Sequence, residues 1–121
     1  MVARSLLEGA GGPRISVVVP VLNEGAGIGA ALQPLQAWRG KGAEIVIVDG
    51  GSSDDTVLQA RDLCDRVLDA SRGRARQMNA GAAVARGRLL LFLHADTQLP
   101  ADAFAMLDAL VDMPRLWGRF D

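Results

Sequence analysis

Leu89-Leu-Leu-Phe-Leu-His-Ala-Asp-Thr97 gives the clearest indication of the fold of this chain. Its five successive apolar residues predict a strand that is buried on both faces, as in a parallel sheet covered by helices. The carboxyl end of this strand brings His94, Asp96 and Thr97 to the edge where open α/β sheets bind ligands. A carboxylate at that edge can hold a divalent cation. The alternative is that Asp96 only turns the chain.

Three further strands are predicted before residue 89, because each is a short run of mainly β-branched and apolar residues. They span residues 15–22, 43–48 and 65–68, and helices are predicted at residues 26–38, 55–64, 75–85 and 100–113. Pro34 predicts a kink in the first helix. Gly81 predicts a close approach of the third helix to a strand or to a ligand. Strands that alternate with helices predict an α/β fold: a doubly wound, mainly parallel sheet with helices on both faces.

The length of 121 residues predicts one domain, which we place at residues 15–121. Residues 1–14 contain a Gly-rich stretch and no periodic apolar pattern, so we expect them to form a flexible leader. The net charge of −1 gives no reason to expect nucleic acid as a partner. No apolar run is long enough for a transmembrane segment and the start lacks a secretory signal, so we expect a cytoplasmic protein.

Positive charge is concentrated between residues 71 and 88, which include five arginines and no acidic residue. Arginine suits a phosphate-bearing ligand, because its planar fork donates two parallel hydrogen bonds. The alternative is a solvated helix face. We favour that alternative for Arg86 and Arg88, which come late in the segment.

Polar residues follow three of the predicted strands: Asn23 and Glu24, then residues 49–54, then residues 94–97. The carboxyl ends of parallel strands meet at one edge, so carboxylates and the arginine-rich helix are expected to share a rim. This combination suits a ligand with a diphosphate and a metal ion, Mg²⁺ or Mn²⁺. The chain has neither G-x-G-x-x-G nor G-x-x-x-x-G-K-[ST], which argues against a dinucleotide dehydrogenase and a P-loop NTPase.

Four motifs together resemble family 2 glycosyltransferases of the inverting, nucleotide-sugar-dependent type. They are Val18-Val-Pro-Val-Leu-Asn-Glu24, Ile47-Val-Asp-Gly-Gly-Ser-Ser-Asp-Asp-Thr56, Arg76-Gln-Met-Asn-Ala-Gly81 and Leu91-Phe-Leu-His-Ala-Asp-Thr97. The His-Ala-Asp-Thr form and Arg72-Gly-Arg-Ala-Arg-Gln-Met-Asn79 are similar to a small branch labelled arsenosugar-biosynthesis-like.

The resemblance implies a GT-A fold that binds a nucleotide-diphosphate sugar. It places Pro20, Asn23 and Glu24 in the nucleotide pocket. It gives Asp49 a hydrogen bond to the base, which we expect to be the uracil of UDP, and it makes Asp54 a support for that loop.

The same resemblance implies roles at the phosphates and the metal. Arg76 and Asn79 match the helix that lies against the diphosphate. Asp96 matches the metal-binding aspartate of a D-x-D signature. His94 stands where that signature has its first Asp. It is a further candidate for a metal contact, although we favour the alternative of a strand-end histidine hydrogen-bonded to a neighbouring loop. Gly50 stands where many relatives have a second Asp.

Members of the family continue well beyond the length of this chain, so we expect residues 15–121 to lack the acceptor half. No motif here matches the carboxylate that acts as general base, and the catalytic residues and the acceptor are therefore not identified. Asp102, Asp108 and Asp112 are expected on a solvated helix face. We also expect a homo-oligomer formed through the C-terminal region, where Trp117 and Phe120 suggest a strand without a partner. The alternative is that the residues after about Met113 are disordered.

Two other functions compete with a transferase. One is a nucleotide-binding or oligomerising module without activity of its own. The other is a sugar-phosphate nucleotidyltransferase, which typically has a Gly-rich, basic loop after its first strand. Residues 20–24 contain no such loop.

Overall fold

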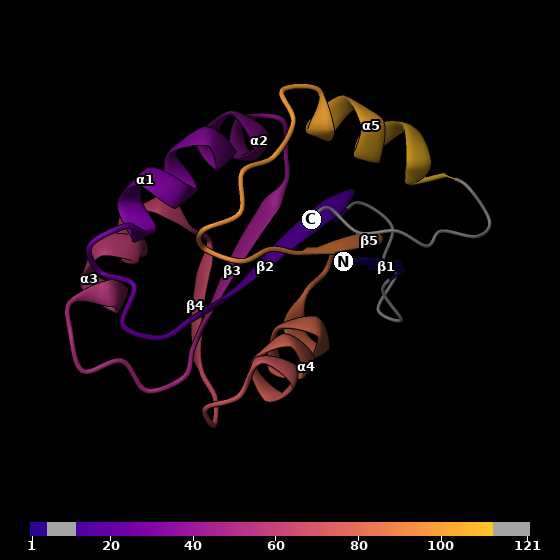
Figure 1. The fold of residues 1–121 in the computed structure, drawn as a ribbon. Coiled ribbons are helices and arrows are strands. Elements are labelled where there is room, and N and C mark those ends of the chain that lie inside the picture. The colour runs from indigo at the N-terminus through magenta and orange to yellow at the C-terminus, as the bar shows by residue number, and fades with distance from the viewer. Residues whose placement is uncertain (5–11, 113–121) are drawn as a thin grey trace.

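The computed structural model describes residues 1–4 and 12–112 as a five-stranded sheet with helices on both faces (Figure 1). The strand order is β1-β5-β2-β3-β4, and only the β1–β5 pair is antiparallel. The strands are β1 (Val2–Arg4), β2 (Ile15–Val21), β3 (Glu44–Asp49), β4 (Arg66–Asp69) and β5 (Leu89–Phe92). The predicted α/β class with a mainly parallel sheet is confirmed.

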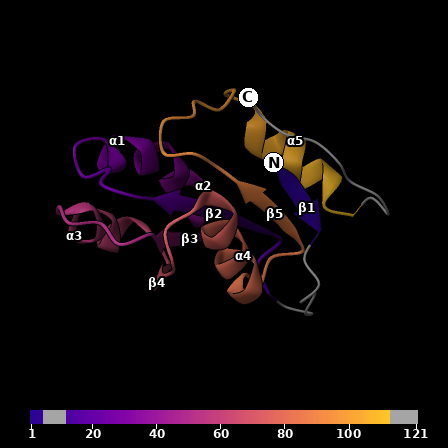
Figure 2. The same cartoon turned by 60° about the horizontal axis from the view of Figure 1, so that its bottom comes forward.

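The helices divide between the two faces of the sheet (Figure 2). One face packs against α4 (Arg74–Val84). The other face packs against the remaining segments: α1 (Ile28–Leu32), η1 (Gln33–Leu35), α2 (Gln36–Gly40), α3 (Thr56–Ala60), η2 (Arg61–Leu63) and α5 (Ala103–Leu110). No helix in these described residues is long and apolar enough to cross a membrane.

The sheet has a hydrophobic core on each face, and side chains that alternate along the central strands contribute to both. In β2, Val17 and Val19 belong to the core under α1, α2 and α5, whereas Val18 belongs to the core under α4. All three are at most 1% exposed. Successive side chains of a strand point to opposite faces, so a continuous apolar run is what a sheet covered on both sides requires.

Pro34 interrupts the first helical segment, as predicted. The 3-10 turn η1 contains this proline and separates α1 from α2. Proline has no N–H to donate and its ring crowds the preceding turn, so the regular helix stops and restarts around it. Both helices keep apolar side chains toward the sheet, including Leu32 and Trp38.

Gly81 brings α4 close to the sheet. A Cβ at this position would lie 2.4 Å from Cγ1 of Val18 and 3.0 Å from Cγ2 of Val48. The close approach predicted for this glycine is therefore to the two central strands rather than to a ligand.

The prediction of a flexible leader is wrong for Val2–Arg4, which form β1. Val2 pairs with Leu91 and is 4% exposed. An unpaired edge of β5 would leave backbone N–H and C=O groups without partners, and three residues from the start of the chain satisfy them. The expected association through the C-terminal region concerns residues 113–121, which lie outside the described residues.

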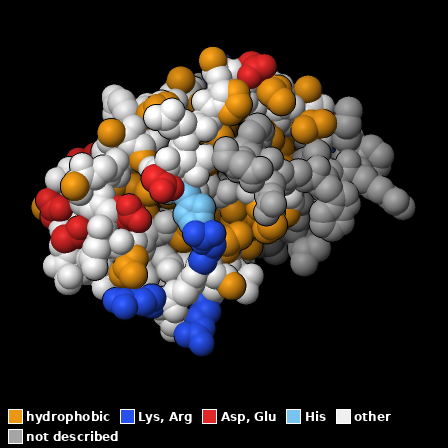
Figure 3. All heavy atoms as spheres, in the orientation of Figure 1, with side chains coloured by type: hydrophobic (Ala, Val, Ile, Leu, Met, Phe, Trp, Pro, Cys, Tyr) orange, Lys and Arg blue, Asp and Glu red, His pale blue; other side chains and the backbone are white. Residues whose placement is uncertain are grey.

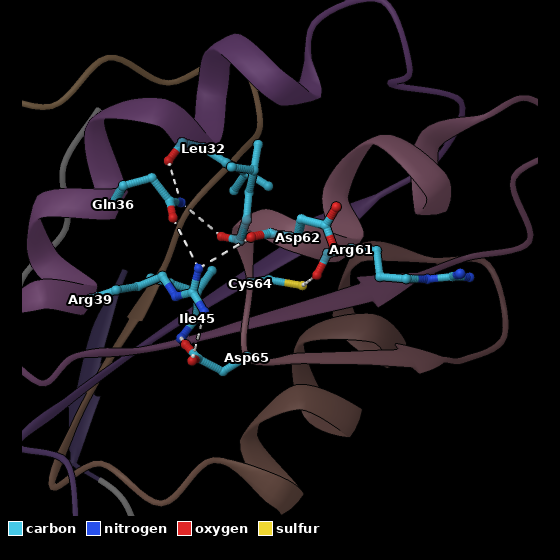
Figure 4. A network of polar contacts seen from close by, with 9 residues as sticks. Leu32, Gln36, Arg39, Ile45, Arg61, Asp62, Cys64 and Asp65 are labelled. Carbon is cyan, nitrogen blue, oxygen red and sulfur yellow. Dashed lines mark hydrogen bonds and ion pairs between the residues drawn. The ribbon is translucent and has the colours of Figure 1, made fainter.

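A polar network joins the amino ends of β3 and β4 to α2 (Figure 4). Nη2 of Arg39 donates to Oδ1 of Asp65 at 3.2 Å, and Oδ2 of Asp65 accepts the N–H of Ile45 at 2.7 Å. Gln36 donates to the carbonyl of Leu63 at 2.8 Å. This network stabilises the end of the sheet opposite to the strand tips that carry the candidate site.

Candidate functional site

The carboxyl ends of β2, β3 and β5 lie at one edge of the sheet. In the parallel register, Val21 of β2 pairs with Asp49 of β3, and Val18 pairs with Phe92 of β5. The segments after these strands therefore leave the sheet as neighbours, as the sequence predicts. Pro20 is half-buried near the end of β2, beside Val48.

Asn23 connects the loop after β2 to the loop after β3. Its N–H donates to Oγ of Ser52 at 2.9 Å, and its Oδ1 accepts the N–H of Ser53 at 2.8 Å. The backbone of Asn23 has φ 52°, a left-handed conformation that asparagine tolerates better than most residues. Asn23, a predicted nucleotide-binding residue, thus holds the two loops together through its own side chain.

A second connection runs from Glu24 and Gly25 to the start of α3. The N–H of Glu24 donates to Oγ1 of Thr56 at 2.8 Å, and the N–H of Gly25 donates to Oδ2 of Asp54 at 3.1 Å. Oδ1 of Asp54 accepts both the N–H and the hydroxyl of Thr56. The Thr56 hydroxyl is the main reason that the pKa of Asp54 lies below its ordinary value.

Asp49 is buried, at 5% exposed, and its carboxylate closes its own loop. Oδ2 accepts the N–H of Gly51 at 3.2 Å and that of Ser52 at 3.0 Å, and Oδ1 accepts the Ser52 hydroxyl at 2.5 Å. A carboxylate has about four lone-pair positions, so these bonds leave little capacity for a further donor. Any bond to a base has to be made alongside these contacts.

The start of α4 is fastened to the same strand tips by Gln77, a residue for which the sequence motifs imply no role. Its side chain is buried, and its Nε2 donates to the carbonyls of Val21 and Val48. Val21 is the last residue of β2, and Val48 is the last but one of β3. A signal for it exists in the sequence: Gln77 precedes Gly81 by four residues. Both therefore lie on the helix face that packs against the sheet.

Three arginines at this end of the molecule have no ion-pair partner among the described residues. Arg72, Arg74 and Arg76 are exposed, as is Asn79. By contrast, Nε of Arg86 forms an ion pair with Oε2 of Glu44 at 3.3 Å. Nη1 of Arg88 likewise forms an ion pair with Oδ1 of Asp112 at 2.9 Å.

Those two paired arginines follow the end of α4, so they do not lie on a solvated helix face as predicted. The three unpaired arginines lie before or within the first turn of α4. The positive end of the helix dipole adds to their charge there.

Asp96 is exposed and makes no hydrogen bond or ion pair within the described part of the chain. It lies in a turn closed by the N–H of Thr97, which donates to the carbonyl of His94 at 3.0 Å. The molecular surface shows the single histidine between acidic side chains on one side and basic side chains on the other (Figure 3). The described residues contain no group of three or more His, Cys, Asp or Glu side chains that could hold a metal by themselves.

These observations reduce the number of carboxylates that are available to a metal ion at the predicted site. The carboxylates of Asp49 and Asp54 accept hydrogen bonds from backbone and hydroxyl groups of their own loop, and Asp54 also accepts one from Gly25 in the loop after β2. Asp96 remains available, and it lines a common pocket with Glu24. The carboxylate of Glu24 also makes no hydrogen bond or ion pair among the described residues. Even a single free carboxylate fits Mg²⁺ or Mn²⁺ when substrate phosphates and water supply the other oxygens.

The pocket shared by Glu24 and Asp96 has a volume of about 740 Å³. It lies between the α1–α2 segment and the chain that leads from β5 to α5, on the opposite side of the sheet from α4. Trp38 and Phe104 form part of its wall and pack edge to face, with ring centroids 5.3 Å apart. Asp96 thus borders an apolar hollow as well as the polar rim.

A family model described as glycosyl transferase family 2 matches residues 16–115. Among curated proteins, a PGL/p-HBAD biosynthesis glycosyltransferase of Mycobacterium bovis is 36% identical over 107 residues, covering 82% of this chain and 42% of the relative. A dodecaprenyl-phosphate galacturonate synthase of Rhizobium johnstonii is 32% identical over 113 residues, covering 79% of this chain and 32% of the relative. The chain spans less than half the length of these relatives.

Two solved structures show the same arrangement of strands and helices. A mannosyltransferase from Pyrobaculum calidifontis, in complex with GDP-Man and Mn²⁺, has a TM-score of 0.73 and 25% identity, covering 91% of this chain and 35% of that one. Glucosyl-3-phosphoglycerate synthase from Mycobacterium tuberculosis, in complex with Mn²⁺, UDP and glucosyl-3-phosphoglycerate, has a TM-score of 0.65 and 27% identity. That match covers 85% of this chain and 41% of that one.

Proposed function

The chain belongs to glycosyl transferase family 2, and from that premise we propose that its strand-tip edge binds the nucleoside diphosphate of a sugar donor. The fold is that of the GT-A glycosyltransferases. In the whole protein, this site serves the transfer of the sugar, with inversion, to an acceptor.

The observation that carries the proposal is the pairing of free positive charge with a free carboxylate at one edge. Arg74 and Arg76 lie in the first turn of α4, which Gln77 fastens to the tips of β2 and β3. A diphosphate placed there gains charge-assisted hydrogen bonds and the favourable end of the helix dipole. Asn79, one turn further along α4, is a third candidate for this contact.

We assign the metal to Asp96, with His94 as the further candidate. A bound Mg²⁺ or Mn²⁺ would neutralise charge on the departing diphosphate. The Mn²⁺ in the complexes of both solved relatives supports a divalent metal. Asp96 would hold it by a carboxylate that no residue of the described chain engages.

We assign the base to the loops joined by Asn23, with Pro20, Glu24 and Asp49 around it. UDP is the nucleotide that we propose, and the UDP complex of one relative supports it. The other relative has GDP-Man, so guanine is the competing base. The loops are held by side chains rather than by the base, which makes the pocket largely preformed.

Calorimetric titration with UDP, GDP, CDP and ADP in the presence of Mn²⁺ tests the proposal. UDP is expected to bind most tightly, and UMP, which lacks the second phosphate, is expected to bind more weakly than UDP. No measurable binding of any nucleoside diphosphate would refute a donor site. Binding of UDP without turnover of a UDP-sugar in the full-length protein would instead favour the binding module.

A further inference from the structure

Gln77 is a polar residue with almost no exposure, at 4%, in the first turn of α4. Its Nε2 donates to the carbonyl of Val21 at 2.9 Å and to the carbonyl of Val48 at 2.9 Å. Its Oε1 accepts the N–H of Gly73 at 3.2 Å. The amide therefore uses both of its donors and one acceptor position inside the protein.

The three partners of Gln77 come from three segments that meet at the candidate site. Val21 ends β2, Val48 lies at the end of β3, and Gly73 directly precedes α4. Gly73 has φ 138°, a conformation that favours glycine, so the chain turns sharply into the helix there. One buried amide thus sets the position of the helix start relative to both central strands.

Gly50 completes the arrangement by leaving room for that amide. A Cβ on residue 50 would lie 2.8 Å from Oε1, 2.9 Å from Cδ and 3.0 Å from Nε2 of Gln77. Gly50 does not have a positive φ, so its backbone conformation does not require glycine. What requires glycine is space, and residues 50 and 77 are therefore interdependent.

We propose that Gln77 is a positioning residue for the donor diphosphate. By fastening the first turn of α4 to the strand tips, it holds Arg74 and Arg76 where they can meet the phosphates. The inference rests on the proposed donor-binding function. The loops assigned to the base have their own connections through Asn23 and Thr56, so Gln77 acts on the phosphates rather than on the base.

The test compares Gln77→Ala with Gln59→Ala, which truncates an exposed glutamine on α3 as a matched control. UDP and uridine are titrated into each protein in the presence of Mn²⁺, by calorimetry and by NMR. Gln77→Ala is expected to lower the affinity for UDP about tenfold, the scale of one lost charge-assisted hydrogen bond, and to leave uridine binding unchanged. Gln59→Ala is expected to change neither.

Gly50→Ala tests the same relationship without truncating the amide. It is expected to weaken UDP binding in the wild-type background and to add nothing when Gln77 is already Ala. Equal losses of UDP and uridine affinity in Gln77→Ala would overturn the positioning role, as would an unchanged affinity for UDP. Should Gln77→Ala fail to fold, an unchanged UDP-to-uridine affinity ratio in Gly50→Ala overturns it. A wild-type protein that binds no UDP refutes the donor site itself, which is a different result.

Discussion

Oδ1 of Asn23 accepts the N–H of Ser53 at 2.8 Å and joins two loops that follow neighbouring strands. The N–H of Asn23 donates back to the adjacent Ser52, so the two loops are bonded in both directions. The base pocket that we propose lies between these loops. Its shape therefore depends in part on the side chain of Asn23 and on the left-handed backbone of this residue.

Replacing Asn23 separates these two contributions. Asn23→Ala removes the bond to Ser53 and puts a less tolerant residue at φ 52°, so we expect the free energy of unfolding to fall by about 1–3 kcal/mol. Asn23→Gly removes only the side-chain bond and should cost less. Denaturant unfolding measures both variants. A loss as large in Asn23→Gly as in Asn23→Ala would rule out the backbone contribution.

Asp49→Ala is expected to weaken UDP binding by about 1–3 kcal/mol, the usual cost of losing a hydrogen bond to a charged group. The structure adds a complication, because the same carboxylate organises the loop around Ser52. Ser52→Ala is the matched variant that loosens this loop but keeps the carboxylate. Calorimetry should show a larger loss of affinity in Asp49→Ala than in Ser52→Ala. Equal losses would mean that Asp49 supports the loop and does not contact the base.

Asp54 makes stability depend on pH in acid. Its pKa is lowered in the folded protein, chiefly by the Thr56 hydroxyl, so the folded state binds the proton more weakly than the unfolded chain does. The stabilisation is present above the unfolded pKa of about 3.9 and is lost as the pH falls through the folded value.

We therefore expect the difference in unfolding free energy between wild type and Asp54→Asn to narrow below about pH 4. Urea unfolding at several pH values measures it. A difference that stays constant from neutral pH into strong acid would contradict the assignment of this contact.

Gly81→Ala should destabilise the protein although alanine favours helices. Helix propensity alone predicts a gain of about 1 kcal/mol, whereas crowding of a packed core costs about 1–3 kcal/mol. The clash with Val18, which is fully buried, decides the sign. Adding Val18→Ala makes room, so the double variant should be more stable than the sum of the two single changes predicts. Stabilisation by Gly81→Ala alone would show that α4 can move away from the sheet.

The sequence predicted the parallel part of the fold because its signals are local. Apolar runs such as residues 15–22 and 89–93 identify buried strands, and Pro34 and Gly81 mark where a helix breaks and where it packs closely. Strand β1 could not be predicted in this way. It has only three residues, and it exists because β5 offers an edge to pair with.

The candidate site was predicted as a list of residues and not as a set of contacts. The acidic residues Asp49, Asp54 and Asp96 look alike in the sequence, but two of them bond to their own loops and only the third is free. Orientation of a side chain depends on which N–H groups surround it in the fold. For the same reason the buried amide of Gln77 was not assigned a role.

Our main proposal is that Asp96 holds a divalent metal beside the bound nucleotide. The affinity for UDP, measured with Mn²⁺ and again with EDTA in wild type and Asp96→Ala, tests it. Asp102→Ala, which removes an exposed carboxylate just before α5, is the matched control. We predict that Mn²⁺ strengthens UDP binding in wild type and in Asp102→Ala and has no effect in Asp96→Ala. The same affinity with Mn²⁺ and with EDTA in wild type, or a full Mn²⁺ effect in Asp96→Ala, would contradict it.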